Sequence, residues 1–118
     1  MESILTSIKK LIGMTADYNH FDTDVIMHIN DAFMTLNQIG VGPERGFMIT
    51  GDSENWEDFL GDTIQLEGVK TYIYYRVRLG FDPPAGSLLE SMNRRANELE
   101  WRLQAQNDYI NKEENQDG

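Results

Sequence analysis

The chain has 118 residues, a size typical of a single domain with one ordinary core. Apolar residues make up 40% and charged residues 25%, a balance typical of a globular protein rather than a disordered one. The absence of cysteine excludes disulfides and thiolate metal sites, and a formal net charge of −10 disfavours general binding of nucleic acid because it repels phosphate.

The acidity has two interpretations. It can simply keep the protein soluble, or it can line a passage through which DNA must slide without sticking. The N-terminal sequence MESILTSIKKLIGM has no continuous apolar segment of the kind found in signal peptides and membrane spans. We therefore expect a soluble intracellular protein with no membrane partner.

Two helices are expected in the first third of the chain. Residues from Glu2 to Ile12 place isoleucine and leucine three or four positions apart, and Gly13 follows as a typical helix terminator. A second helix is predicted from Asp22, which can cap it, to about Ile39. The side chains expected to be buried on this helix are Val25 or Ile26, Ile29, Ala32, Phe33 and Leu36.

The next segment, GVGPERGFMITGDS at residues 40–53, is typical of an irregular loop because of its glycines. Within it, Phe47-Met48-Ile49 has the character of a short β segment. The chain offers no second convincing strand, so a strand partner could come from another subunit. A short helix then follows at about Glu54 to Leu60, with Asp52 or Ser53 as its cap. It lies in an acidic cluster formed by Asp52, Glu54, Glu57, Asp58 and Asp62.

A third long helix is predicted from Asp62 or Thr63 to Phe81, with apolar residues on more than one side. Gly68 and Gly80 weaken it by about 1 kcal/mol each relative to alanine, and close packing against a neighbour would explain Gly68. Pro83 disfavours helical backbone at the residue before it and so ends the helix.

The last helix is predicted to start at a capping box formed by Ser87 and Glu90 and to run to about Gln106. Its apolar residues alternate spacings of three and four, which predicts packing along a partner helix within the subunit or between subunits. These residues, here called the seam, are Leu89, Met92, Ala96, Leu99 and Leu103, with Gln106 and Ile110 continuing the pattern. The fold class is therefore all-α, with four main helices, one short helix and an irregular loop. We expect a helical domain over residues 1–107 and a frayed, acidic tail over residues 108–118.

Nothing in the sequence predicts an enzyme, a metal site or a cofactor. His20 and His28 are the only histidines, and although Asp24 and Asp31 lie one turn from His28, a metal site needs three or four converging ligands. A solvated helix face is the better interpretation. The serines lack a nucleophile elbow, and GVGPERG lacks the Gly-Lys-Ser/Thr end of a phosphate-binding loop.

The arginines favour helix packing or subunit contacts. Glu90 with Arg94, and Glu98 with Arg102, have the spacing and order of ion pairs on one helix face. Acidic residues around Trp56 could dock a basic, apolar patch of a partner. The candidates for contact with other subunits or partners are Phe47, Met48, Ile49, Trp56, Phe59, Tyr72, Tyr75, Arg76, Arg78, Arg94, Arg95 and Trp101.

Taken in order, four segments resemble the phage head–tail connector family of phages and prophages of Gram-positive bacteria, also called adaptor, head-completion or DNA-packaging proteins. The segments are FDTDVIMHINDAFMTLNQIGVGP, WEDFLGD, VKTYIYYRVRLGFDPP and LLESMNRRANELEWRL. The resemblance implies an all-α subunit that assembles into a ring, typically a dodecamer, beneath the portal protein. Such a ring extends the DNA channel, contacts passing DNA non-specifically, and docks a stopper or tail protein. The family supplies no catalytic residues, and the resemblance implies a virion protein that is present in the host cytoplasm during assembly.

On this interpretation the helices over residues 63–81 and 87–106 form the packing framework. The loop over residues 40–53 reaches a neighbour or projects into the channel, and the C-terminal helix or tail engages the portal. An alternative function is a small intracellular adaptor or regulator that binds a partner helix through the Leu89–Leu103 seam.

Overall fold

The computed structural model describes residues 2–60 and 66–116, with the side chains of all of these except residues 60 and 109–116. The helices are α1 (Ile4–Leu11), α2 (Asp22–Gln38), α3 (Trp56–Leu60), α4 (Leu66–Phe81) and α5 (Ser87–Gln116). The described residues hold no strand, and the only bridge among them joins Ser3 to Asn55. The all-α prediction is therefore confirmed, whereas the short β segment expected at Phe47 to Ile49 is wrong.

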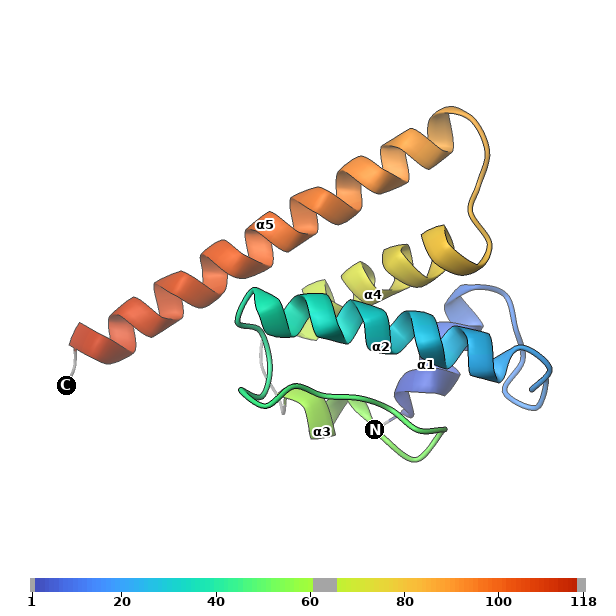
Figure 1. Cartoon of the computed structure of the whole chain (residues 1–118), viewed down its shortest axis with the longest axis horizontal. Helices are drawn as coiled ribbons and strands as arrows, with labels where there is room; N and C mark the ends of the chain where they lie inside the picture. Colours follow the sequence, from blue (N-terminus) through green and yellow to red (C-terminus); the bar gives the residue numbers. More distant parts are fainter. Residues whose placement is uncertain (1, 61–65, 117–118) are drawn as a thin grey trace.

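Helices α2 and α4 form the central pair, with α1 and α3 on one side and α5 on the other (Figure 1). The core lies between them, and it includes the side chains that periodicity predicted on α2, with Val25 rather than Ile26 fully buried. Helix α5 has 30 residues, or about 45 Å at 1.5 Å per residue, and it extends beyond the rest of the molecule (Figure 1). Its length explains why the longest dimension of the chain is 50 Å.

The first two helices begin differently from the prediction. The hydroxyl of Ser3 accepts the backbone N–H of Thr6 at 3.1 Å and caps α1. Asp22 does not cap α2, because it is already the first helical residue and Phe21 precedes it. Its carboxylate instead lies 2.8 Å from the ammonium of Lys9, which is buried on α1. This ion pair joins α1 to the start of α2.

The caps of α3 and α5 also differ from the prediction. Asn55, not Asp52 or Ser53, caps α3: its side-chain oxygen accepts the N–H of Asp58 at 3.1 Å, while the Asp58 carboxylate accepts the N–H of Asn55 at 2.9 Å. Helix α5 starts at Ser87 itself, after Gly86 at φ +66°. Ser87 is thus one position too far along the chain to act as the cap that the Ser87–Glu90 box requires.

The loop over residues 40–53 is held within the subunit, so it has no need of a strand from a neighbour. The side-chain amide of Asn30 on α2 accepts the N–H of Ile49 at 2.8 Å and donates to the carbonyl of Ile49 at 3.0 Å. This pair of bonds supplies both backbone groups of Ile49 with the partners that a strand would otherwise provide. Farther along α2, Asn37 donates to the carbonyls of Pro43 and Glu44.

The seam of α5 packs against α4 in the same subunit. Met92, Ala96 and Leu103 are buried, and a Cβ added to Gly68 on α4 would lie 3.4 Å from the side chain of Leu103. That distance is an ordinary van der Waals contact, so the packing against Leu103 leaves room for a Cβ, and the close approach that would explain Gly68 is not found. Because α4 covers the seam, the alternative function in which a foreign helix binds it loses its binding surface.

Three predictions concern residues outside the described ones. They are the start of the third helix at Asp62 or Thr63, the place of Asp62 in the acidic cluster, and the packing of Ile110. Helix α5 continues to Gln116, well past the expected end near Gln106. The division into a domain over residues 1–107 and a frayed tail over residues 108–118 stays a prediction.

Candidate protein interface

Four of the predicted contact residues are buried inside the subunit. Ile49, Trp56, Phe59 and Tyr72 all belong to the core. The indole N–H of Trp56 donates to the hydroxyl of Ser7 on α1 at 2.8 Å, which ties α3 to the N-terminal helix. These four side chains pack inside the subunit, so they stabilise the fold and do not contact a partner directly.

An aromatic cluster fixes the loop over residues 40–53 against the core. The ring centroid of Phe33 lies 5.1 Å from that of Phe47 and 4.6 Å from that of Phe59. Phe47 and Phe59 are 5.3 Å apart, and these tilted or edge-on arrangements are the favourable ones for aromatic pairs. Phe47 is only partly buried and so contributes to both the core and the surface.

A polar cluster joins α4 to α5. The guanidinium of Arg76 donates to the Tyr72 hydroxyl at 3.0 Å, to the side chain of Asn97 at 3.3 Å, and to the carboxylate of Glu100. Burial raises the pKa of Tyr72 above its ordinary value, although the hydrogen bond and the charge of Arg76 oppose this. Burial alone would lower the pKa of Arg76, but the bonds to Tyr72 and Glu100 raise it. Arg76 is therefore a permanent cation that clamps the two long helices together.

The other α4 candidates also make contacts within the subunit. The Nε of Arg78 donates to the carbonyl of Asp82 at 2.6 Å, at the C-terminal end of its own helix. The ring of Tyr75 is half-buried and lies 5.5 Å from that of Tyr74. Of the two ion pairs predicted on α5, the one between Glu98 and Arg102 is present.

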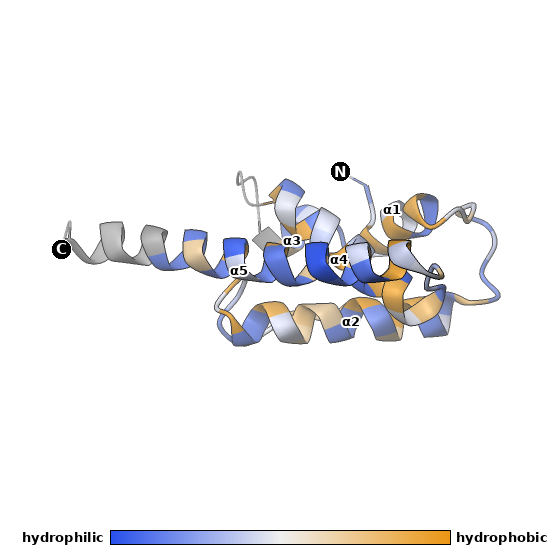
Figure 2. Cartoon of the chain, turned by 90° about the horizontal axis from the view of Figure 1, so that it is seen from above, coloured by the Kyte–Doolittle hydropathy of each residue, from blue (hydrophilic) through white to orange (hydrophobic). Residues whose placement is uncertain are grey.

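Four candidates remain exposed: Met48, Arg94, Arg95 and Trp101. Trp101 is 69% exposed and Met48 is 68% exposed, values that are unusual for large apolar side chains. The structure does not bring these four residues together, because Met48 lies on the loop and the other three lie on α5. Figure 2 shows that α5 is otherwise largely hydrophilic, which makes its exposed tryptophan more conspicuous.

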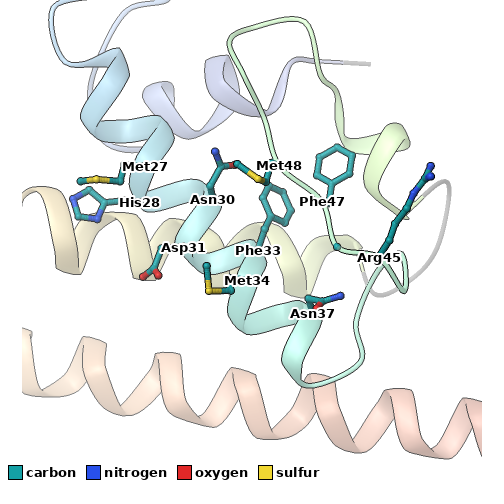
Figure 3. Close-up of a pocket in the computed structure, with 11 residues that line it drawn as sticks. Met27, His28, Asn30, Asp31, Phe33, Met34, Asn37, Arg45, Phe47 and Met48 are labelled. Carbon is teal, nitrogen blue, oxygen red and sulfur yellow. The ribbon is translucent and has the colours of Figure 1, made fainter.

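Met48 belongs to a groove between α2 and the loop, here called the methionine groove, whose volume is about 670 Å³ (Figure 3). Two further methionines on the groove are also well exposed, Met27 at 59% and Met34 at 61%. Sequence analysis missed both. The available signal was their spacing of seven residues on the face of α2 opposite its core stripe, where polar side chains are expected.

Charged residues lie on the groove at two places. Asp31 lies on α2 between Met27 and Met34, and Arg45 lies on the loop beside Asn37 (Figure 3). His28 also lines the groove, and its ring contacts Gly80 on α4 so closely that a Cβ there would clash. The groove thus combines apolar side chains of methionine and phenylalanine with one acidic and one basic side chain.

Two residues of the acidic cluster around α3 make local carboxylate hydrogen bonds: Asp58 with Asn55, and Glu54 with Thr50. Although burial by itself would raise the pKa of Glu54, hydrogen bonds from the hydroxyl and N–H of Thr50 lower it. Within the part of the chain that the structure describes, no three His, Asp or Glu side chains are grouped so that they could hold a metal. No described helix is both long and apolar enough to span a bilayer.

Comparison with known families finds a match over most of the chain. A family model described as "Phage connector protein" matches residues 4–110, which is nearly the whole chain and includes the five helices of the described residues apart from the last part of α5. No curated protein and no solved structure matches the chain.

Proposed function

The chain belongs to the phage connector protein family, and on that premise we propose that it forms a ring under the portal protein at the junction of head and tail. Membership gives it a structural role in a phage connector. In the proposed arrangement the ring extends the DNA channel, offers a docking surface to a stopper or tail protein, and is part of the virion.

The observation that carries this proposal is that large apolar side chains are exposed on a subunit that already has a continuous core. Met27, Met34, Met48 and Trp101 are each more than half exposed, although the buried side chains of α1, α2, α4 and α5 form a continuous core. Exposed apolar groups gathered in a groove mark contact sites with other proteins. A connector subunit needs such sites for its neighbours and for the proteins above and below it.

The acidic character of the chain supports the same proposal. Twenty acidic residues against ten basic ones give a surface that repels the phosphate backbone of DNA. A channel wall of this kind lets the genome pass without binding it. The same charge keeps separate copies apart in solution, which favours assembly on a template such as the portal over assembly in the free state.

Sedimentation with purified portal rings of the same phage tests the proposal. The chain is mixed with the rings in excess and separated on a density gradient, with an unrelated acidic helical protein of similar mass as the control. We expect the chain, but not the control, to move with the portal in a fixed ratio of several copies per ring. A chain that stays at the top of the gradient at every concentration contradicts the proposal.

A further inference from the structure

The structure presents two separate apolar contact features that lie on different elements. One is the methionine groove between α2 and the loop, and the other is Trp101 on α5. Ala96 on the buried side of α5 and Trp101 are five residues apart, which places them about 140° apart around the helix. Trp101 therefore points away from α4. Since both features are exposed, neither covers the other within one copy.

The shapes of the two features are complementary. The groove is open and has three exposed methionines in its lining, whereas Trp101 is an exposed side chain on a helix of 30 residues. Methionine side chains are flexible and polarizable and make favourable contacts with aromatic rings. Tryptophan is also the side chain that most often dominates the energetics of a protein interface. The groove of one copy can thus receive the tryptophan of another.

Charge supports the same match. On α5, Arg94, Trp101 and Asp108 are exposed and recur every seven residues, so that one face presents a cation, an aromatic ring and an anion in order. On the groove, Asp31 lies among the α2 methionines and Arg45 lies on the loop (Figure 3). An α5 helix laid along the groove can bring Arg94 to Asp31 and Asp108 toward Arg45, with the tryptophan between them.

We propose that the methionine groove binds the Trp101 face of α5 from a second copy of this chain. The contact joins two different surfaces, so each bound copy leaves one groove and one α5 face free for the next copy. Contacts of this head-to-tail type produce rings when the rotation between copies closes. The inference rests on the proposed function, because it names the subunit contact of the proposed ring.

The chain has no cysteine, so introduced thiols are unique and their cross-links identify the contact. Met34→Cys places a thiol in the groove, and Ala105→Cys places one on the exposed side of α5, one turn from Trp101. Each variant alone and the two mixed are treated with a short bifunctional thiol reagent, with and without portal rings. Leu11→Cys, exposed on α1 and outside the lining of the groove, is the matched control.

The expected result is a cross-linked dimer from the mixture of Met34→Cys and Ala105→Cys, and a ladder of multimers from the double variant. The control gives neither product with either partner. Dimers from Met34→Cys alone would mean a symmetric contact between grooves and would overturn the proposal.

A second variant tests the energetics. Trp101→Ala weakens self-association at least about tenfold, whereas Leu88→Ala, an exposed site on the same helix, leaves it unchanged. Equal association of both alanine variants contradicts the proposed contact.

The outcomes separate this contact from the proposed function. If the chain sediments with portal rings but gives no cross-link between Met34→Cys and Ala105→Cys, the proposed contact is overturned and the proposed ring under the portal is supported. The product in solution, from a chain that never sediments with portals, supports the contact and overturns the ring under the portal. No product and no association under either condition overturn both.

Discussion

Asn30 provides the sharpest test of how the structure is held together, because one side chain satisfies both backbone groups of a buried residue. Ile49 is 1% exposed, and its N–H and carbonyl bond the Asn30 amide at 2.8 and 3.0 Å. Asn30→Ala removes both partners. A buried polar group left without a hydrogen bond costs about 1–3 kcal/mol, and nearby water at the open groove lowers the cost. We expect a loss of about 2–4 kcal/mol in the free energy of unfolding.

Urea unfolding followed by circular dichroism measures this loss, and thermal unfolding gives a parallel readout. For a domain of this size 1 kcal/mol corresponds to about 4 °C, so the melting temperature should fall by roughly 8–16 °C. Asp31→Ala, an exposed change at the next position, should stay within about 0.5 kcal/mol of the parent. If Asn30→Ala also stays within that range, the Asn30–Ile49 bonds do not hold the loop.

Asn30→Asp adds a signature that a simple loss of packing would not produce. A carboxylate still accepts the N–H of Ile49 but repels its carbonyl, whereas a protonated carboxyl can donate to that carbonyl. The folded state therefore favours the protonated form, and the pKa of the new carboxyl rises above its unfolded value. The variant should approach the stability of the parent at acidic pH and lose that stability as pH rises through the folded pKa. A pH-independent difference would refute this account.

Three further predictions concern other parts of the chain. Gly42→Ala places a Cβ against the ring of Phe59 at a backbone φ of +92°, so the free energy of unfolding in urea should fall by at least about 1–3 kcal/mol. In the control Gly51→Ala the added Cβ meets no atom, so this change should be neutral or slightly stabilising. The raised pKa of Tyr72 means that folding favours its neutral hydroxyl, so stability is complete below pH about 10 and falls above it; Tyr72→Phe should flatten that alkaline decline in a pH series. Lys9→Met should cost about 1–3 kcal/mol because it leaves the Asp22 carboxylate without its cation, and adding Asp22→Asn should restore part of this in a double-mutant cycle.

The sequence alone determined which residues form helices and which of their faces are buried. Periodicity of three and four predicts an apolar face, and this information is local, so it identifies Ile29, Ala32 and Phe33 as buried on α2. Glycine and proline also act locally, and Gly13 and Gly40 follow α1 and α2 at positive φ as expected. The order of these segments was enough to indicate the connector family.

Capping was harder to predict because several polar residues compete near each helix start. The sequence predicts Asp22 as a cap, but in the fold its carboxylate forms an ion pair with Lys9 of α1. Asn55, rather than Asp52 or Ser53, caps α3 because Asp58 lies three residues later and completes the reciprocal pair of hydrogen bonds. That signal is present in the sequence.

Only the tertiary structure decided which partner each surface meets. The seam of α5 required a neighbouring helix, but periodicity is the same whether that helix belongs to the same subunit or to another, and the structure assigns it to α4. The same holds for Trp56 and Phe59: their apolar character is compatible with an interface, but the fold buries both in the core. Conversely, periodicity places Met27 and Met34 opposite the core stripe of α2, but only the tertiary structure sets them beside Met48 on one groove. Apolar character is encoded locally, whereas the surface that covers it depends on contacts between residues far apart in the chain.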